Sequence, residues 1–246
     1  INLSEFVQDP FTDHAQFDFE GLKHCVDVAV RALNEVLEEG LPLHPLEEQR
    51  ESVAEWRQIG LGIMGLADCL IKLGLTYGEE DAVEMCDNIG FAMADSAIAA
   101  SAMLAKEKGP FAACNTEEIM STPYFEANTT EKTRELVRKY GMRNSQLLTI
   151  APTGTLSTML GISGGIEPVY ANYYERKTES LHGTDVYYKV YTKIVESYMK
   201  QHGIKNDADL PDYFVTAMTL DYRQRIDMQA VWQTHIDASI SSTVNV

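Results

Sequence analysis

The residues whose types and spacing best suit binding chemistry are small, polar and uncharged. They follow one another at Thr153, Gly154 and Thr155. A short apolar run at residues 147–150 precedes them, and residues 156–160 resemble the first turns of a helix. A strand, a tight turn and a helix start bring several backbone N–H groups to one point, an arrangement that binds anions and phosphate above all. The same pattern also fits an ordinary helix cap, with Thr153 or Thr155 accepting from the backbone.

A second candidate is Ser163 in the sequence GISGG (residues 161–165), which matches the GxSxG pattern of serine hydrolases. Asp185 and His202 follow in the hydrolase order. The pattern must connect a strand to a helix, whereas here a predicted helix precedes it and Ile-Glu-Pro follows. A glycine loop is therefore the preferred interpretation, and a serine hydrolase using Ser163 remains an alternative.

Residues 60–65, GLGIMG, match the dinucleotide-binding pattern GxGxxG. That pattern requires a hydrophobic strand directly before it, and the preceding residues are Glu-Trp-Arg-Gln. We interpret these glycines as residues that let a buried helix, predicted at 59–73, pack closely against a neighbour. A nicotinamide enzyme is the weakest alternative, and no Walker A sequence accompanies the Thr-Gly-Thr turn.

Cysteine and histidine give little support for metal chemistry. The four cysteines are widely spaced, form no CxxC pair and lie in apolar helical patterns, which predicts buried free thiols in a reducing compartment. The six histidines are scattered, with no HExxH or ExxH arrangement. The sequence has no signal-peptide pattern and no run of 18 apolar residues, so we expect a cytoplasmic protein without membrane contact. The missing initiator Met indicates a piece of a longer protein.

Length and charge limit the class further. A chain of 246 residues is compatible with one large domain, and we predict a single domain over residues 1–246. The formal net charge of −17 argues against a surface that grips nucleic acid through its phosphates, which requires clustered Lys and Arg. One nucleotide in a local pocket remains compatible with that charge.

Hydrophobic periodicity predicts a mixed α/β chain with helices between isolated strands. Asp18 is the predicted cap of the first helix, which ends at Gly40 and Pro42. Further helices are expected at residues 47–56, 59–73, 79–108, 130–140, 156–160, 185–202, 211–220 and 223–237. Strands are expected at residues 1–7, 147–150, 169–178 and 241–246, and loops at 74–78 and 111–128.

Four segments together resemble the catalytic subunit of ribonucleotide reductase. They are RQIGLGIMGLADCLIKLGL (57–75), RNSQLLTIAPTGTLS (143–157), GIEP (165–168) and MQAVWQTHIDASISSTVN (228–245), in the order expected of the C-terminal half of that subunit. APTGTLS and the closing SISSTVN are most similar to the adenosylcobalamin-dependent class. The resemblance covers essentially the whole chain.

The resemblance implies a helix-rich portion, the second half, of a ten-stranded α/β barrel. It also implies that Pro152, Thr153, Gly154, Thr155 and Leu156 hold the substrate's phosphates, with Ser157 at the helix start as a further member of this set. No chemical step is assigned to the GIEP segment. This reading agrees with the anion site inferred above from the free backbone donors.

The resemblance places the reaction itself outside this chain. The family's radical-bearing cysteine lies on a finger loop upstream, the reducing cysteines lie upstream too, and none of Cys25, Cys69, Cys86 and Cys114 matches a catalytic position. A thiyl radical must reach the ribose at contact distance, so the isolated chain is expected to be inactive. A non-catalytic partner-binding module is the alternative, which a long exposed apolar face along residues 1–7 and 241–246 would mark.

The implied partners are a ribonucleoside di- or triphosphate substrate and the remaining half of the catalytic subunit, in a homodimer of full-length subunits. The implied cofactor is adenosylcobalamin, with a radical-generating, metal-containing partner subunit as the alternative. Neither direct nucleic-acid binding nor membrane association is expected.

Overall fold

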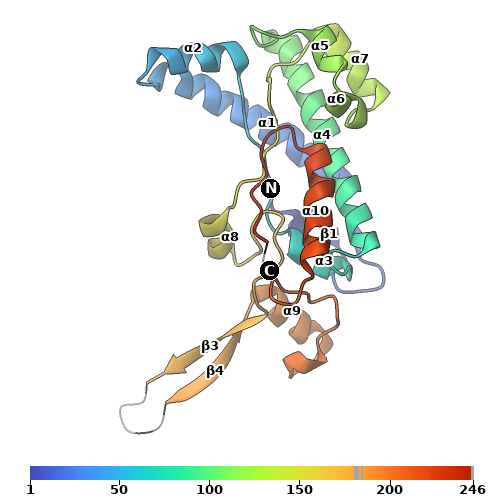
Figure 1. Cartoon of the computed structure of the whole chain (residues 1–246), viewed down its shortest axis with the longest axis vertical. Coiled ribbons are helices and arrows are strands. Elements are labelled where there is room, and N and C mark those ends of the chain that lie inside the picture. Colours follow the sequence, from blue (N-terminus) through green and yellow to red (C-terminus); the bar gives the residue numbers. More distant parts are fainter. Residues whose placement is uncertain (180–182, 184, 245–246) are drawn as a thin grey trace.

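The computed structural model describes residues 1–179, 183 and 185–244. Long helices stand beside a set of extended segments, and a hairpin projects from one end of the molecule (Figure 1). The elements are η1 (Leu3–Phe6), β1 (Val7–Gln8), β2 (Gln16–Phe17), α1 (Phe19–Gly40), η2 (Leu41–Leu43), α2 (Glu47–Trp56), α3 (Leu66–Leu73), α4 (Glu80–Lys108), α5 (Thr116–Met120), α6 (Pro123–Ala127), α7 (Glu131–Tyr140), α8 (Gly154–Leu160), β3 (Tyr173–Thr178), β4 (Val186–Tyr191), α9 (Lys193–His202), η3 (Asp207–Asp209) and α10 (Tyr222–His235).

The core is built around α4, against which α1, α7 and α10 pack. Most of the buried positions of α4 are small residues, which let neighbouring helices approach closely. At Gly90 the ring of His235 in α10 occupies the place that a Cβ would need. By length and composition α4 would also qualify as a membrane span, but 67% of its most apolar window is buried inside the protein, as in the core helix of a globular domain.

Several helices begin and end where the sequence predicts. Asp18 caps α1 by accepting a hydrogen bond from the Gly21 amide at 2.9 Å, and Thr130 caps α7 through its hydroxyl. The predictions for α2, α4 and α10 are confirmed to within two residues. A capping side chain marks the starts of α1, α7 and α10, whereas Leu46 and Glu79, which precede α2 and α4, make no side-chain cap bond. The signal that these helices share is composition and spacing within one segment.

The predicted helix at 59–73 is only half correct, because residues 59–65 are extended and α3 begins at Leu66. Four extended segments lie side by side and parallel, joined by the bridges Asn2 to Met64, Leu61 to Leu148 and Ile150 to Ile240. Most apolar side chains of the two middle segments are buried, whereas Ile1, Met64 and Ile240 are half-buried. A nearly continuous apolar run does not distinguish a buried strand from a buried helix, which explains the error.

The segment predicted as one helix at 185–202 is a strand followed by a helix. β4 pairs with β3 in an antiparallel hairpin from Tyr173 opposite Tyr191 to Thr178 opposite Val186, and α9 follows. The pairing partner decides this structure, since Val186–Tyr191 is rich in β-branched and aromatic residues that favour a strand once another strand is beside it.

Other predictions require correction as well. Residues 111–128 contain α5 and α6 instead of an open loop, and residues 211–220 form turns instead of a helix. Residues 1–7 are mostly the short helix η1, and only Val7 enters a strand. Residues 241–244 have no strand assignment, although Ser241 donates to the Ile150 carbonyl at 2.8 Å. The rest of that predicted strand, Asn245 and Val246, lies outside the described residues.

The architecture is therefore helix-rich α/β, with parallel extended segments between helices. The described residues form no closed barrel. Along residues 1–7 and 241–244, Leu3 is buried and residues 241–243 are polar, whereas Val244 is 41% exposed. The partner-binding module stays an alternative.

Candidate anion site at the start of α8

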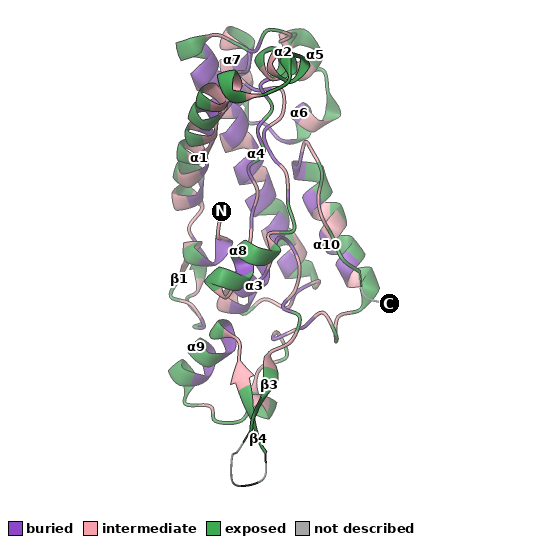
Figure 2. Ribbon diagram, turned by 90° about the vertical axis from the view of Figure 1, so that its left-hand side faces the viewer, coloured by how far each residue is buried: buried purple, intermediate pink, exposed green. Residues whose placement is uncertain are grey.

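The predicted anion loop lies at the carboxyl end of a buried parallel segment. Leu147, Leu148 and Ile150 are at most 1% exposed, and the chain then emerges at Pro152. The loop and nearly all of α8 are exposed, on the surface of the molecule (Figure 2). The carboxyl ends of parallel strands are where α/β proteins bind their ligands, so the site has the expected location.

The N-terminus of α8 has unpaired amides. The first turn closes when the Ser157 amide donates to the Thr153 carbonyl at 2.8 Å. In the described part of the chain, the amides of Gly154, Thr155 and Leu156 have no hydrogen-bond acceptor. Three exposed N–H groups at one helix end carry a partial positive charge and are suited to an anion.

Thr153 precedes the helix in an unusual conformation. Its φ is +51°, in the left-handed region, and its side chain does not cap α8. The hydroxyl Oγ1 instead accepts a hydrogen bond from the Gly165 amide at 3.0 Å. The ordinary-cap interpretation of Thr153 is therefore wrong, and the hydroxyl retains its own proton for a further acceptor.

Ser157 and Thr158 point back along the helix. The Ser157 hydroxyl donates to the Gly154 carbonyl at 3.2 Å, and the Thr158 hydroxyl donates to the same carbonyl at 2.7 Å. Ser157 is only 5% exposed. The contact of Ser157 with an anion stays a prediction. Thr155 has an exposed side chain beside the free amides, and its contact with an anion is a prediction as well.

The other end of α8 is also held. Lys193, the first residue of α9, donates from Nζ to the Leu160 carbonyl at 2.8 Å. A cation at a helix C-terminus interacts favourably with the helix dipole and satisfies an otherwise unpaired carbonyl. This contact orients α8 relative to α9, and no local sequence pattern predicts it.

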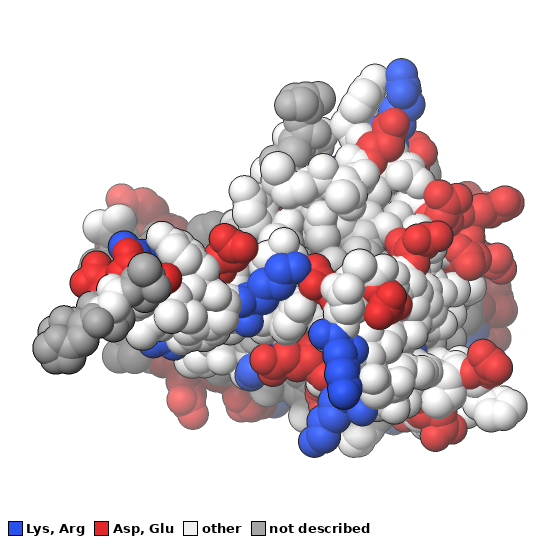
Figure 3. Space-filling view, turned by 90° about the horizontal axis from the view of Figure 1, so that it is seen from below, with Lys and Arg blue, Asp and Glu red and all other residues white. Residues whose placement is uncertain are grey.

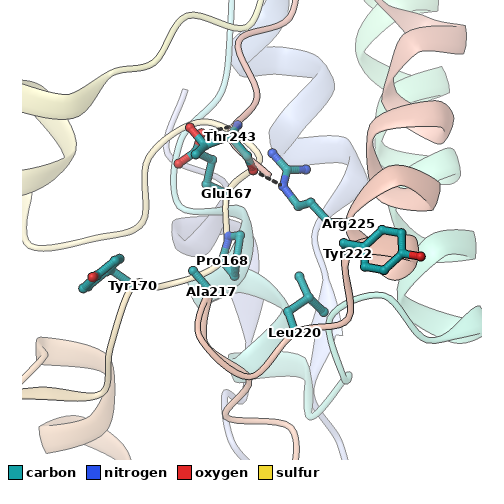
Figure 4. A pocket seen from close by; sticks show the side chains of 8 residues that line it. All are labelled: Glu167, Pro168, Tyr170, Ala217, Leu220, Tyr222, Arg225 and Thr243. Atoms are coloured by element: carbon teal, nitrogen blue, oxygen red, sulfur yellow. Dashed lines mark hydrogen bonds between the residues drawn. The ribbon is translucent and has the colours of Figure 1, made fainter. Parts of the chain in front are cut away.

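A glycine-rich loop supports the anion loop from behind. At Gly164 an added Cβ would lie 2.9 Å from the Pro152 carbonyl oxygen, so only glycine allows this close approach. Glu167 then accepts a hydrogen bond from the Thr243 amide at 3.0 Å. Beside it lies a cavity of about 140 Å³, lined among others by Pro168 and Arg225 (Figure 4).

The structure contradicts the serine-hydrolase alternative. Ser163 is 5% exposed, and its hydroxyl accepts from the Ala67 amide at 3.2 Å. The proposed partners lie elsewhere, since His202 stacks on Tyr198 and Asp185 pairs with Lys177. The serine is thus a structural residue, without the base that a nucleophile requires.

The GLGIMG segment is a packing device, as predicted, but in an extended segment and not in a helix. At Gly62 the Thr149 carbonyl oxygen occupies the place of a Cβ, and at Gly60 the Thr149 methyl group lies 2.7 Å from it. The glycines let two parallel segments approach each other, and they do not form a dinucleotide loop.

The cysteines are free thiols; Cys69 and Cys86 are buried, as predicted, whereas Cys25 and Cys114 are only half-buried. Burial raises the pKa of the Cys86 thiol to about 12 and that of Cys69 further. Among the described residues, no group of three or more His, Cys, Asp and Glu side chains is placed to hold a metal ion. Lys and Arg side chains are interspersed with acidic ones on the face that Figure 3 shows, which contains no continuous basic surface.

Comparison with known proteins places the chain in context. A family model described as "Ribonucleotide reductase, barrel domain" matches residues 1–246. A vitamin B12-dependent ribonucleoside-diphosphate reductase of Thermoplasma acidophilum is 31% identical over 263 residues, covering 100% of this chain and 31% of that protein. The ribonucleoside-diphosphate reductase subunit alpha of Chlamydia pneumoniae is 33% identical over 201 residues, covering 73% of this chain and 19% of that protein.

A eukaryotic relative shows the same relationship. The ribonucleoside-diphosphate reductase large chain of Encephalitozoon cuniculi is 29% identical over 267 residues, covering 99% of this chain and 34% of that protein. The chain thus spans from about a fifth to a third of the length of these curated relatives.

Proposed function

Because the chain belongs to the ribonucleotide reductase barrel-domain family, we propose that it is part of a subunit that converts ribonucleotides to 2′-deoxyribonucleotides by thiyl-radical chemistry. In this proposal residues 1–246 are a single domain, the second half of a ten-stranded α/β barrel. The parallel arrangement of four extended segments supports it. The remaining part of the subunit is the partner, in a homodimer of full-length subunits.

We propose that residues 152–157 bind the phosphates of the substrate. The observation that carries the proposal is the group of three exposed amides at Gly154, Thr155 and Leu156 without an acceptor in the described structure. Each hydrogen bond to a charged phosphate contributes about 1.5–3 kcal/mol when it replaces a bond to water. The relatives are named ribonucleoside-diphosphate reductases, so a ribonucleoside diphosphate is the proposed substrate.

The contribution of this loop to the reaction is orientation. A phosphate fixed on the amides of α8 holds the attached ribose at a defined distance from the barrel axis, where the radical chemistry takes place. The loop carries no charged side chain and no titratable group, so it donates hydrogen bonds without exchanging protons with the substrate.

Adenosylcobalamin is the cofactor that we propose for the longer enzyme, in line with the name of the Thermoplasma relative. When bound, it would supply the radical. In the part of the chain that the structure describes, no group of three or more His, Cys, Asp and Glu side chains is placed to hold a metal ion, and we derive no step through the cofactor. Cys69 and Cys86 are buried with raised thiol pKa values, so we propose that this chain alone is inactive.

Titration of the isotopically labelled chain with a ribonucleoside diphosphate tests the phosphate site. We expect the amide resonances of Gly154, Thr155 and Leu156 to shift with a dissociation constant on the order of 1 mM. A nucleoside without phosphates is the matched control and should leave these resonances in place. Absence of shifts, or equal shifts with the nucleoside, would contradict the assignment; deoxynucleotide formation by the chain alone would contradict its predicted inactivity.

A further inference from the structure

The conformation of Thr153 requires an explanation that its own segment does not give. A β-branched residue with a φ of +51° is strained by roughly 1–3 kcal/mol and persists only where its surroundings fix it. Among the described residues, the hydrogen bond that fixes its side chain runs from the Gly165 amide to Thr153 Oγ1, at 3.0 Å. The shape of the anion loop therefore depends on the position of Gly165.

The segment that carries Gly165 is attached to the start of α3 by a reciprocal pair of hydrogen bonds. The Ser163 hydroxyl accepts from the Ala67 amide at 3.2 Å, and the Asp68 carboxylate accepts from the Ser163 amide at 2.7 Å. A third bond, from the Gly65 amide to the Ser163 carbonyl at 2.8 Å, completes the attachment. Serine and acidic side chains that exchange bonds in this way form a capping box, here between segments 95 residues apart.

Burial makes this attachment strong. Asp68 is 3% exposed and Ser163 is 5% exposed, so water does not replace either partner easily. A buried carboxylate is stable only with charge-assisted hydrogen bonds, and the Ser163 amide at 2.7 Å provides one. Loss of the carboxylate would leave a buried N–H unpaired and release the loop that carries Gly165.

Resting on the function proposed above, we propose that Asp68 and Ser163 are positioning residues for the anion loop. Through Gly165 they hold Thr153 in its left-handed conformation, and thereby keep the amides of residues 154–156 directed at the phosphate. Neither side chain contacts the anion itself. The buried N-terminus of α3 in this way determines the geometry of the exposed N-terminus of α8.

The test uses the 246-residue chain and inorganic pyrophosphate as the probe. Asp68→Ala removes the acceptor of the Ser163 amide, Asp68→Asn retains one oxygen acceptor, and Asp18→Ala is the matched control. Asp18 also accepts a helix-start amide, that of Gly21, but it lies directly before α1, outside the anion loop and the segments that support it. Two quantities are measured, the pyrophosphate dissociation constant and the hydrogen-exchange rate of the Gly165 amide.

We expect Asp68→Ala to raise the pyrophosphate dissociation constant about tenfold and to speed Gly165 exchange by a similar factor. Asp68→Asn should stay within about threefold of wild type, because it keeps an acceptor. Asp18→Ala should lower the melting temperature comparably, yet leave both quantities within about twofold. If Asp68→Ala does not fold, Ser163→Ala, which deletes only the bond to Ala67, takes its place with a smaller change in the same direction.

The outcomes separate the two proposals. If wild type binds pyrophosphate and Asp68→Ala binds it equally well, the positioning role is overturned while the phosphate site stands. If wild type does not bind pyrophosphate, the phosphate site is overturned, and Gly165 exchange then decides the positioning role. Exchange that is no faster in Asp68→Ala than in Asp18→Ala overturns that role, and faster exchange supports the attachment of the loop.

Discussion

The starts of α3 and α8 are two versions of one local structure. Each helix follows an extended segment, the two segments are parallel neighbours through Leu61 and Leu148, and each helix is preceded by a left-handed residue, Gly65 or Thr153. At α3 the protein supplies a cap from Ser163, and the first turn is buried. At α8 no side chain of the described residues caps the helix, and the first turn is exposed.

The difference shows that helix starts in this fold are not uncapped in general: the start of α8 is uncapped and the start of α3 is capped. Unsatisfied helix amides are unfavourable when buried, so α3 must have its cap. At α8 the amides face solvent, where water satisfies them until a stronger acceptor arrives. The same residue that caps α3, Ser163, belongs to the loop that holds Thr153 through Gly165, so the closed helix start supports the open one.

The largest expected effect comes from forcing apart the two parallel segments that lead into α3 and α8. In Gly62→Ala the new methyl group would meet the Thr149 carbonyl oxygen, a backbone atom that cannot move without its strand. We expect the free energy of unfolding to fall by about 3 kcal/mol, measured by urea denaturation. Gly40→Ala is a suitable control, since no atom lies within 4 Å of an added Cβ there and its φ of −74° is one that alanine adopts without strain. Equal losses in both variants would show that strand contact at Gly62 is unimportant.

An exchange of the two left-handed residues sharpens the comparison. Gly65→Thr forces a branched side chain to a φ of +73° and against the Asn2 side chain, and we expect a loss of about 2 kcal/mol in stability. Thr153→Gly relieves strain and loses one hydrogen bond, so its net effect should lie within about 1 kcal/mol. Thermal unfolding measures both. A Thr153→Gly variant that is less stable than Gly65→Thr would mean that Thr153 is not strained.

Glu38 holds the beginnings of the same two parallel segments, at the ends away from α3 and α8. Its Oε1 accepts from Arg57 Nη2 at 2.6 Å and from Arg143 Nη2 at 2.7 Å, the arginines that lead into the two parallel segments. Burial alone would raise the pKa of Glu38, but the hydrogen bonds from Arg143 and Arg57 outweigh it, so the pKa lies below the ordinary value of 4.5. The stabilisation by the Glu38 carboxylate is therefore complete above pH 4.5, and it is lost as the pH falls through the lowered pKa of Glu38.

Because the pKa of Glu38 is lowered in the folded protein, we expect Glu38→Gln to lower the free energy of unfolding by about 1 kcal/mol at pH 7. The difference from wild type should shrink as the pH falls below 4.5. Denaturation series at several pH values measure it. A difference that stays constant down to pH values well below 4.5 would contradict the role of the ionised carboxylate.

The smallest expected effect concerns the exposed hydroxyl of Thr155. Thr155→Ala should weaken phosphate binding about threefold, because it removes one neutral donor and leaves the amides in place. Stability should change by less than about 0.5 kcal/mol, since the side chain is exposed. Thr158→Ala is the control, as its hydroxyl already donates to the Gly154 carbonyl. Equal binding by wild type and Thr155→Ala would restrict the site to backbone amides.

Local signals in the sequence were sufficient for the long helices. Asp18 marks the start of α1, and the helices predicted at residues 79–108 and 130–140 are α4 and α7, because capping and periodicity act within one segment. The Thr-Gly-Thr turn likewise predicted a helix start, which lies at Gly154, two residues before the predicted position, and the anion site there stays a prediction. Strands that need a partner, as in β4, could not be predicted this way, since their conformation is decided by pairing.

The sequence by itself predicted a helix start at the Thr-Gly-Thr turn, because that signal is local, and binding of an anion there stays a prediction. Only the tertiary structure decided that α8 stays open while α3 is closed. That decision depends on Ser163 and Asp68 meeting across 95 residues of chain. A hydrogen bond between distant segments leaves no periodic trace in the sequence, and it exists only once the parallel segments have brought the two helix starts together.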